Sequence, residues 1–150
     1  MIKMFSAVQV SDYLSPFDQT VDGFDDGWWE RAGSLRRSQE ERFSFFEGDS
    51  EVARAEVAHD WQFDALAYEK TPVNPRSPYV TFFEVRSDLY RAGVGRAAMA
   101  LLVDHYKGSD LIAYSLNADW FWQAIGWRLI RRIDGYKFSS PLYVHLRDDA

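Results

Sequence analysis

The stretch from residue 80 to 106 constrains the fold more than any other part of the chain. Residues 79–85, Tyr-Val-Thr-Phe-Phe-Glu-Val, form a β-branched and aromatic run that is typical of a strand. After a polar link at 86–91, apolar residues recur at the i, i+3, i+4, i+7, i+8 spacing of one helix face: Val94, Ala97, Ala98, Leu101 and Leu102. The stretch therefore predicts a strand, a glycine-bearing turn and a helix.

A turn of this kind can bind an anion. The first amides of a helix have no intrahelical acceptor, and the helix dipole adds partial positive charge there. Gly93 and Gly95 would let the backbone approach a ligand closely, because glycine has no Cβ. Phosphate oxygens suit such a site, and Arg91 and Arg96 could add charge-assisted contacts. On spacing alone, a tight turn without a ligand is the alternative.

Two segments resemble motifs of one known family. Arg91-Ala-Gly-Val-Gly-Arg96, after a strand that ends at Val85, resembles the acetyl-coenzyme A signature Gln/Arg-x-x-Gly-x-Gly/Ala of the GCN5-related N-acetyltransferase (GNAT) superfamily. Residues 118–127, Ala-Asp-Trp-Phe-Trp-Gln-Ala-Ile-Gly-Trp, resemble the family's downstream segment Ala-x-x-φ-Tyr-x-x-x-Gly-Phe. The two motifs occur in the family's order and cover residues 78–133, whereas the N-terminal half matches only in its order of elements.

The resemblance implies a fold and an activity. The expected fold is α+β, a single domain over residues 1–150, with a mixed, largely antiparallel sheet of six to seven strands and about four flanking helices. The expected activity is transfer of an acetyl group from acetyl-coenzyme A to a primary amine, either a small cationic amine or a peptide or protein amine. The alternative is a non-catalytic module of the same fold that binds an acyl-coenzyme A as a sensor or partner subunit.

The resemblance also implies which residues bind the coenzyme. They are Val85 and Arg86 at the strand end, Arg91, Ala92, Gly93, Val94, Gly95 and Arg96 at the turn, and Ser115, Asn117 and Trp122 downstream. The outer phosphate could be reached by arginines near the C-terminus, although surface arginines are often only solvated: Arg128, Arg131 and Arg132.

The motifs depart from the family pattern at two places. The leading Gln/Arg position holds Tyr90, with Arg91 one residue later. The family's tyrosine, its usual acid toward the leaving thiolate, falls on Trp122, and an indole cannot donate that proton at ordinary pH. The remaining candidate acids are Ser115, Tyr114 and Tyr136, or the thiolate leaves unassisted.

Glu84 is the candidate general base. It precedes Val85 on the central predicted strand, where related enzymes often hold a carboxylate. The alternative is that strand alternation points Glu84 outward.

The acceptor side is expected in the N-terminal half. Residues 18–30 hold five acids, no base and three large aromatic residues, which suits a cationic amine through Coulomb attraction and cation–π contact. The predicted substrate residues are Asp25, Asp26, Trp28 and Trp29, with His59, next to Asp60, as a further candidate. The alternatives are a solvated acidic loop with two core tryptophans, and a histidine that merely ends a strand.

Other elements follow from periodicity and turn residues. Strands are predicted at 1–10, 43–46, 51–58, 110–116, 127–133 and 136–146, with turns at Gly48-Asp49 and Asp134-Gly135. Helices are predicted from Ser11 or Ser15, over 35–42, and over 118–125 with Gly126 as the stop.

Composition and charge indicate which partners and which cellular compartment to expect. Residues 1–75 carry 15 acids and 7 bases, and residues 76–150 carry 8 acids and 10 bases, so the net charge of −6 disfavours nucleic acid as a partner. Three dispersed histidines and no cysteine predict neither a metal site nor disulfides. The chain lacks a signal pattern and a long apolar run, which predicts a cytoplasmic protein that does not bind membranes, with a homodimer possible.

Overall fold

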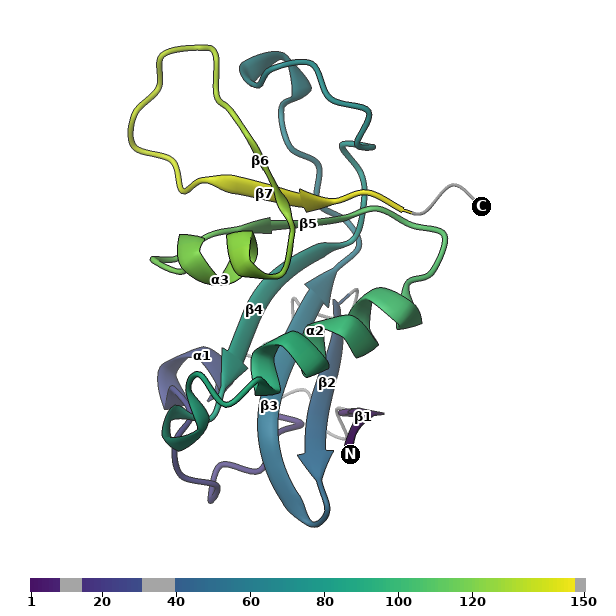
Figure 1. The fold of residues 1–150 in the computed structure, drawn as a ribbon, viewed down its shortest axis with the longest axis vertical. Coiled ribbons are helices and arrows are strands. Elements are labelled where there is room, and N and C mark those ends of the chain that lie inside the picture. The colour runs from purple at the N-terminus through teal and green to yellow at the C-terminus, as the bar shows by residue number, and fades with distance from the viewer. Residues whose placement is uncertain (9–14, 31–39, 148–150) are drawn as a thin grey trace. The chain divides into compact units, whose positions relative to one another are not determined.

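The computed structural model describes residues 1–8, 15–30 and 40–147. Seven strands form one sheet in the order β1-β2-β3-β4-β5-β7-β6. The strands are β1 (Ile2–Ser6), β2 (Glu40–Glu47), β3 (Ser50–Ala58), β4 (Tyr79–Val85), β5 (Leu111–Tyr114), β6 (Arg128–Ile130) and β7 (Leu142–His145). The helices are α1 (Asp26–Glu30), α2 (Val94–His105) and α3 (Asp119–Ala124), with 3-10 turns η3 (Ala65–Ala67) and η4 (Ser87–Leu89) (Figure 1).

The sheet is mixed and mostly antiparallel, as the sequence predicted. β1 pairs antiparallel with β2, and β7 pairs antiparallel with both β5 and β6. β4 and β5 are parallel, with Tyr79 opposite Ile112, so the chain between them must cross over, and α2 makes that connection. The described residues contain three α-helices, where about four were expected.

The helix predicted over 35–42 is wrong in its last three residues, while residues 35–39 lie outside the described part. Residues 40–42 begin β2 instead. The charged residues that suggested a helix instead form an ion pair between neighbouring strands. The buried guanidinium of Arg42 pairs with the buried carboxylate of Glu56 on β3, 3.3 Å away. Ser15 also starts no helix, since its hydroxyl donates to the Trp29 carbonyl at 2.7 Å. A start at Ser11 lies outside the described residues.

The two closing strands β6 and β7 pair antiparallel as predicted, but they do not form the predicted tight hairpin around Asp134-Gly135. β6 and β7 pair only over Arg128–Ile130 and Leu142–His145, and residues 131–141 form a long loop. After Ile130 the chain leaves β7 and pairs with residues 67–69, because the Ile133 amide donates to the Ala67 carbonyl and Tyr68 bridges Arg132. The turn residues are therefore real, with Gly135 at φ 82°, but they lie inside the loop.

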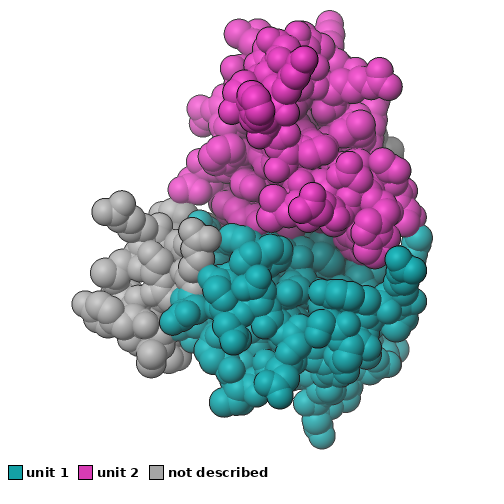
Figure 2. All heavy atoms as spheres, turned by 90° about the vertical axis from the view of Figure 1, so that its left-hand side faces the viewer, with its two compact units in different colours: residues 1–57, 82–105 teal, residues 58–81, 106–150 magenta. Residues whose placement is uncertain are grey.

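The chain divides into two compact units (Figure 2). Unit 1 comprises residues 1–57 and 82–105, and its core includes Phe17, Phe24 and Trp29. Unit 2 comprises residues 58–81 and 106–150, and its core includes Phe63 and Ile112. The single domain over residues 1–150 stays a prediction.

Across the described ranges, every helix is too short or too polar to cross a lipid bilayer. The cytoplasmic location stays a prediction of the sequence.

Candidate functional site

The turn between β4 and α2 has the form that the sequence predicted. Gly93, immediately before the helix, adopts the left-handed φ of 81°, and Arg91 is left-handed as well at 66°. The hydrogen bond from the Ala97 amide to the Gly93 carbonyl, 3.1 Å long, opens the helical series. The amides of Gly93, Val94 and Gly95 precede it, so they have no acceptor within the helix.

The space around this turn is open. A Cβ built on Gly93 would meet no atom within 4 Å, and Arg91 is exposed. Helix α2 is fixed in place by one buried face, which includes Val94, Ala98 and Leu102. Gly93 is exposed, whereas Val94 and Gly95 are buried, so the turn presents the Gly93 backbone to solvent at the start of a fixed helix, a position where phosphate groups can bind.

Arg86 is held within unit 1. Its guanidinium pairs with Asp88 at 2.6 Å and donates to the Ser50 hydroxyl and the Glu51 carbonyl, both at 2.9 Å. The hydrogen bond to Asp88 raises the pKa of Arg86 above its ordinary value, and it lowers the pKa of Asp88 below its own. The side chain therefore fastens the link after β4 to the start of β3.

Glu84 faces the segment that the sequence proposed as the acceptor wall. Its Oε1 accepts two hydrogen bonds at 2.8 Å, one from the Asp25 amide and one from the Trp29 indole. No hydrogen bond joins Oε2 to any described residue. Glu84 thus anchors that segment through one oxygen, while the other has no partner among the described residues.

Residues 17–30, which we call the acidic segment, are held partly by aromatic packing and by hydrogen bonds of two of their five acids. Trp29 is 0% exposed and packs edge-on against Phe17 at 4.8 Å between ring centroids. The Asp25 carboxylate accepts from the Trp28 amide at 3.2 Å, at the start of α1. Asp26 is exposed, and Trp28 is half-buried against Phe82. The sequence proposed Asp25, Asp26, Trp28 and Trp29 together, and of these the two aspartates are exposed.

Two residues that the sequence analysis missed hold the acidic segment in place. The Arg54 side chain on β3 is 1% exposed, ion-paired with Glu51 at 2.7 Å, and it donates to the Asp18 carbonyl at 2.7 Å. Its guanidinium lies 4.1 Å from the centre of the Phe24 ring. Gly23 is the second, because a Cβ there would lie 2.6 Å from the Cγ of Arg86. A buried arginine within an apolar strand was the available signal for this anchor.

In unit 2, the residues after β5 take local structural roles. The buried Ser115 hydroxyl accepts from the Ala118 amide at 3.0 Å, just before α3. Asn117 is exposed and left-handed, with φ 59°, a conformation that asparagine tolerates better than most residues. Trp122 is buried against Trp127, 4.7 Å between ring centroids, so it lies in the core of unit 2.

Of the other candidates in unit 2, Tyr114 directly precedes Ser115, whereas Tyr136 and His59 lie in other segments. Burial raises the pKa of the Tyr114 phenol, so it stays protonated at neutral pH. Tyr136 is exposed in the 131–141 loop, beside the Arg132 guanidinium at 4.8 Å. His59 is exposed, and its Nε2 lies 3.4 Å from the Tyr106 hydroxyl. Arg132 pairs with Asp134 at 2.8 Å, while Arg128 and Arg131 are exposed.

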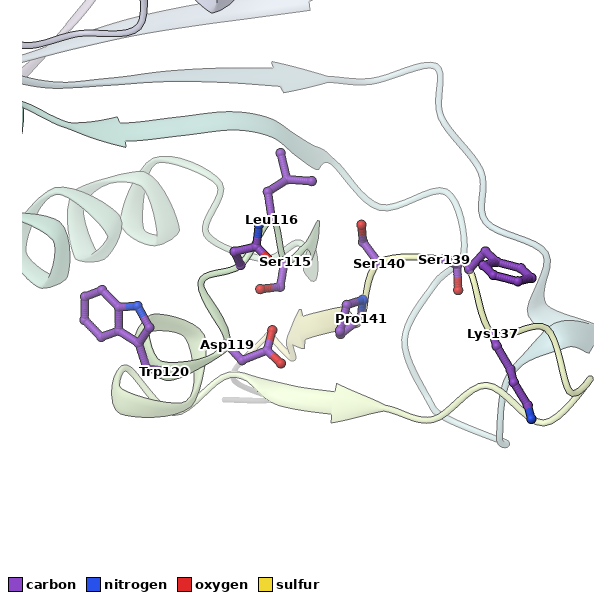
Figure 3. Close-up of a pocket in the computed structure, with 10 residues that line it drawn as sticks. Ser115, Leu116, Asp119, Trp120, Lys137, Ser139, Ser140 and Pro141 are labelled. Atoms are coloured by element: carbon purple, nitrogen blue, oxygen red, sulfur yellow. The ribbon is translucent and has the colours of Figure 1, made fainter.

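A pocket of about 600 Å³ opens between the start of α3 and the 131–141 loop (Figure 3). Its lining residues all belong to unit 2: Ser115, Leu116, Asn117, Asp119, Trp120, Lys137, Phe138, Ser139, Ser140 and Pro141. Ser115 and Asn117 were predicted as site residues, whereas Tyr136 does not line this pocket. The sequence analysis missed Asp119, Trp120 and Phe138, although the first two lie inside the second motif.

The described parts of the chain contain no group of three or more acidic or histidine side chains able to hold a metal ion. The absence of a metal site stays a prediction for the whole chain.

This chain resembles known proteins in its three-dimensional structure and not in its sequence. No protein-family model matches this chain, and no curated protein resembles it in sequence. Among solved structures, an acetyltransferase from Thermus thermophilus is 22% identical with a TM-score of 0.52, and the match covers 72% of this chain and 64% of that one.

Matches over nearly the whole chain are found at lower identity. AtaT complexed with acetyl-methionyl-tRNAfMet is 12% identical, with a TM-score of 0.66 and coverage of 97% of this chain and 95% of that chain. An acetyltransferase assigned to the GNAT family from Desulfovibrio desulfuricans is 12% identical, with a TM-score of 0.61 and coverage of 97% and 99%. AtaTR bound with AcCoA matches with a TM-score of 0.60 at 12% identity, covering 96% and 92%. This chain therefore has the fold of the GNAT acetyltransferases, as its two motifs predicted.

Proposed function

We propose that this protein is an acetyl-coenzyme A-dependent N-acetyltransferase that acts on a primary amine. The observation that carries the proposal is the start of α2, where the amides of Gly93, Val94 and Gly95 precede the first helical hydrogen bond. The open space at Gly93 lets a diphosphate approach these donors, and the exposed Arg91 adds positive charge. The neighbouring fold supports the same cosubstrate, since AtaTR was solved with AcCoA bound.

Transfer forms a C–N bond to the acetyl carbon and breaks its C–S bond, so the amine loses a proton and the thiolate gains one. Glu84 suits the role of base, because Oε1 is fixed by two donors while Oε2 has no partner among the described residues. Ser115 is the proposed proton donor, since its hydroxyl lines the pocket. Tyr114 and Tyr136 remain alternatives for that role.

The acceptor is proposed to be a small or peptide amine. The net charge of −6 disfavours a nucleic-acid acceptor for this chain, although AtaT was solved with an acetylated methionyl-tRNA. We also propose a homodimer and a cytoplasmic location for this protein.

The second candidate is a non-catalytic module that binds an acyl-coenzyme A. One observation favours it: the family's tyrosine position holds Trp122, and that indole is buried against Trp127. A residue packed in this way cannot protonate a thiolate.

Titration calorimetry with a matched pair of variants tests coenzyme binding. Gly93 and Gly108 both have a left-handed φ, and a Cβ at either position would meet open space. Gly93→Ala and Gly108→Ala should therefore carry the same backbone strain, on the order of 1 kcal/mol. Only Gly93→Ala should weaken acetyl-coenzyme A binding, by roughly tenfold, because the strain moves the phosphate-binding amides.

Release of free thiol separates the two candidates. Turnover with at least one amine from a broad panel supports the enzyme. Heat of binding without thiol release across the panel favours the module, and no heat with any acyl-coenzyme A overturns both.

A further inference from the structure

Three side chains of the pocket in unit 2 are exposed: Asp119, Trp120, which packs edge-on against Phe121, and Phe138, which packs edge-on against Tyr136. The Asp119 carboxylate is exposed, and no described residue forms a hydrogen bond or ion pair with it. Trp120 is 61% exposed and Phe138 is 88% exposed, which is unusual for side chains of this size. All three line the same pocket, and in Figure 3 Asp119 and Trp120 lie on its α3 side.

Local structure explains only part of this arrangement. Asp119 lies in the first turn of α3, where a negative charge favours the helix dipole. The helix dipole gives no reason for the two exposed aromatic rings. A partly apolar pocket with a few polar groups is the usual form of a small-molecule site.

We propose that this pocket binds the amine acceptor, and that the acceptor is a primary amine with one positive charge and a flat aromatic ring. The inference rests on the proposed function. The ammonium group would bind the Asp119 carboxylate, and the ring would stack on Trp120 or Phe138. Ser115, the proposed proton donor, lines the same pocket.

Lys137 further restricts the class of amine that the pocket would bind. It lines the pocket from the 131–141 loop, and in Figure 3 its ammonium group points away from Asp119. Because this ammonium group is exposed and points away from Asp119, it would repel a second ammonium group on the ligand only at longer range. We therefore expect a modest preference for an amine with a single charge.

Three amines test this class by calorimetry on the full chain, with coenzyme A present. The probes are 2-phenylethylamine, which has one charge and a ring, n-butylamine, which has one charge and no ring, and putrescine, which has two charges and no ring. We expect 2-phenylethylamine to bind at least about fivefold more tightly than n-butylamine, which is the scale of one aromatic contact. Putrescine should bind more weakly than n-butylamine, and Lys137→Gln should reduce that difference.

Matched variants assign the binding to this pocket. Asp119 and Asp104 are both exposed and both lie on a helix, and Asp104 does not line the pocket. Asp119→Asn should weaken 2-phenylethylamine binding roughly tenfold, because a charge-assisted hydrogen bond is lost, whereas Asp104→Asn should leave it unchanged. Trp120→Ala should weaken binding about fivefold, and Trp120→Phe should restore most of it.

Equal binding of the three amines would overturn the inference, and so would loss of binding in Asp104→Asn but not in Asp119→Asn. These outcomes are distinct from failure of the proposed function. That failure would appear as no heat with acetyl-coenzyme A, or as no thiol release with any amine, whichever variant is measured.

Discussion

The acidic segment of unit 1 and the pocket of unit 2 both combine carboxylates with indoles, yet they use them differently. In the acidic segment, Trp29 is fully buried and its indole N–H is bound by Glu84. The Asp18 carboxylate accepts from both the amide and the hydroxyl of Thr20. In the pocket, Asp119 has no partner among the described residues, and Trp120 is exposed.

This difference shows that charge density along the sequence does not identify a binding site. The acidic segment holds five acids, but several of its polar groups serve its own conformation and its attachment to β3 and β4. A single carboxylate without a partner, beside exposed rings, offers more to a ligand. The two regions can be separated by experiment.

The largest expected effect is loss of the anchor under the acidic segment. Arg54→Met should lower the free energy of unfolding by roughly 3–5 kcal/mol, because it leaves the buried Glu51 carboxylate without its partner. Urea denaturation measures this change. Arg128→Met, at an exposed position, should change stability by less than about 0.5 kcal/mol, and an equally small loss in Arg54→Met would mean that the segment does not depend on this anchor.

The next largest effect is expected at Glu84. Two variants separate its role as a structural anchor from its proposed role as the general base. Glu84→Ala removes the acceptor of two hydrogen bonds and should destabilise the protein by about 2 kcal/mol. Glu84→Gln keeps an oxygen that can accept both bonds, so its stability should stay near that of the wild type.

Turnover then distinguishes the roles of Glu84. If Glu84 is the base, Glu84→Gln should lower kcat by about 100-fold or more while acetyl-coenzyme A affinity is unchanged. Full turnover in Glu84→Gln across the pH range would leave Glu84 as an anchor only.

The smallest expected effect is a pH dependence in both regions. Hydrogen bonds from Thr20 hold the pKa of Asp18 below 3.8, and the Arg132 guanidinium holds the pKa of Asp134 below the same value. A carboxyl whose pKa is lower in the folded state stabilises the protein above its unfolded pKa, and this stability is lost as the pH falls through the folded value. Both groups should therefore contribute at neutral pH and lose that contribution below about pH 4.

Thermal unfolding between pH 7 and pH 2.5 measures that contribution. Asp18→Asn and Asp134→Asn should each reduce the fall in Tm on acidification by a small amount. An unchanged acid response in both variants would mean that these carboxylates do not differ between the folded and unfolded states.

The sequence predicted the elements whose pattern is local. β4 occupies residues 79–85 as expected, because a β-branched and aromatic run favours a strand without outside help. α2 begins at Val94, just after Gly93, as its apolar spacing indicated. The second motif helix also ends as predicted, with Gly126 left-handed at φ 85°.

Elements that depend on distant partners were predicted less well. The charged residues 40–42 favour a helix by themselves and become strand only because Arg42 finds Glu56 on β3. The strand predicted over 136–146 shortened to Leu142–His145, because residues 131–133 pair with 67–69 instead of β7. Periodicity carries no information about such partners.

The sequence by itself determined the strand, turn and helix at residues 79–105, and through them the GNAT fold, because propensity, spacing and glycine conformation act between near neighbours. Only the tertiary structure decided that Glu84 and Arg54 hold the acidic segment while Asp119 and Trp120 stay open. The physical reason is that folding decides which partners surround a polar group. These partners determine whether the group is already hydrogen-bonded or can bind a ligand, and they lie far away in the chain.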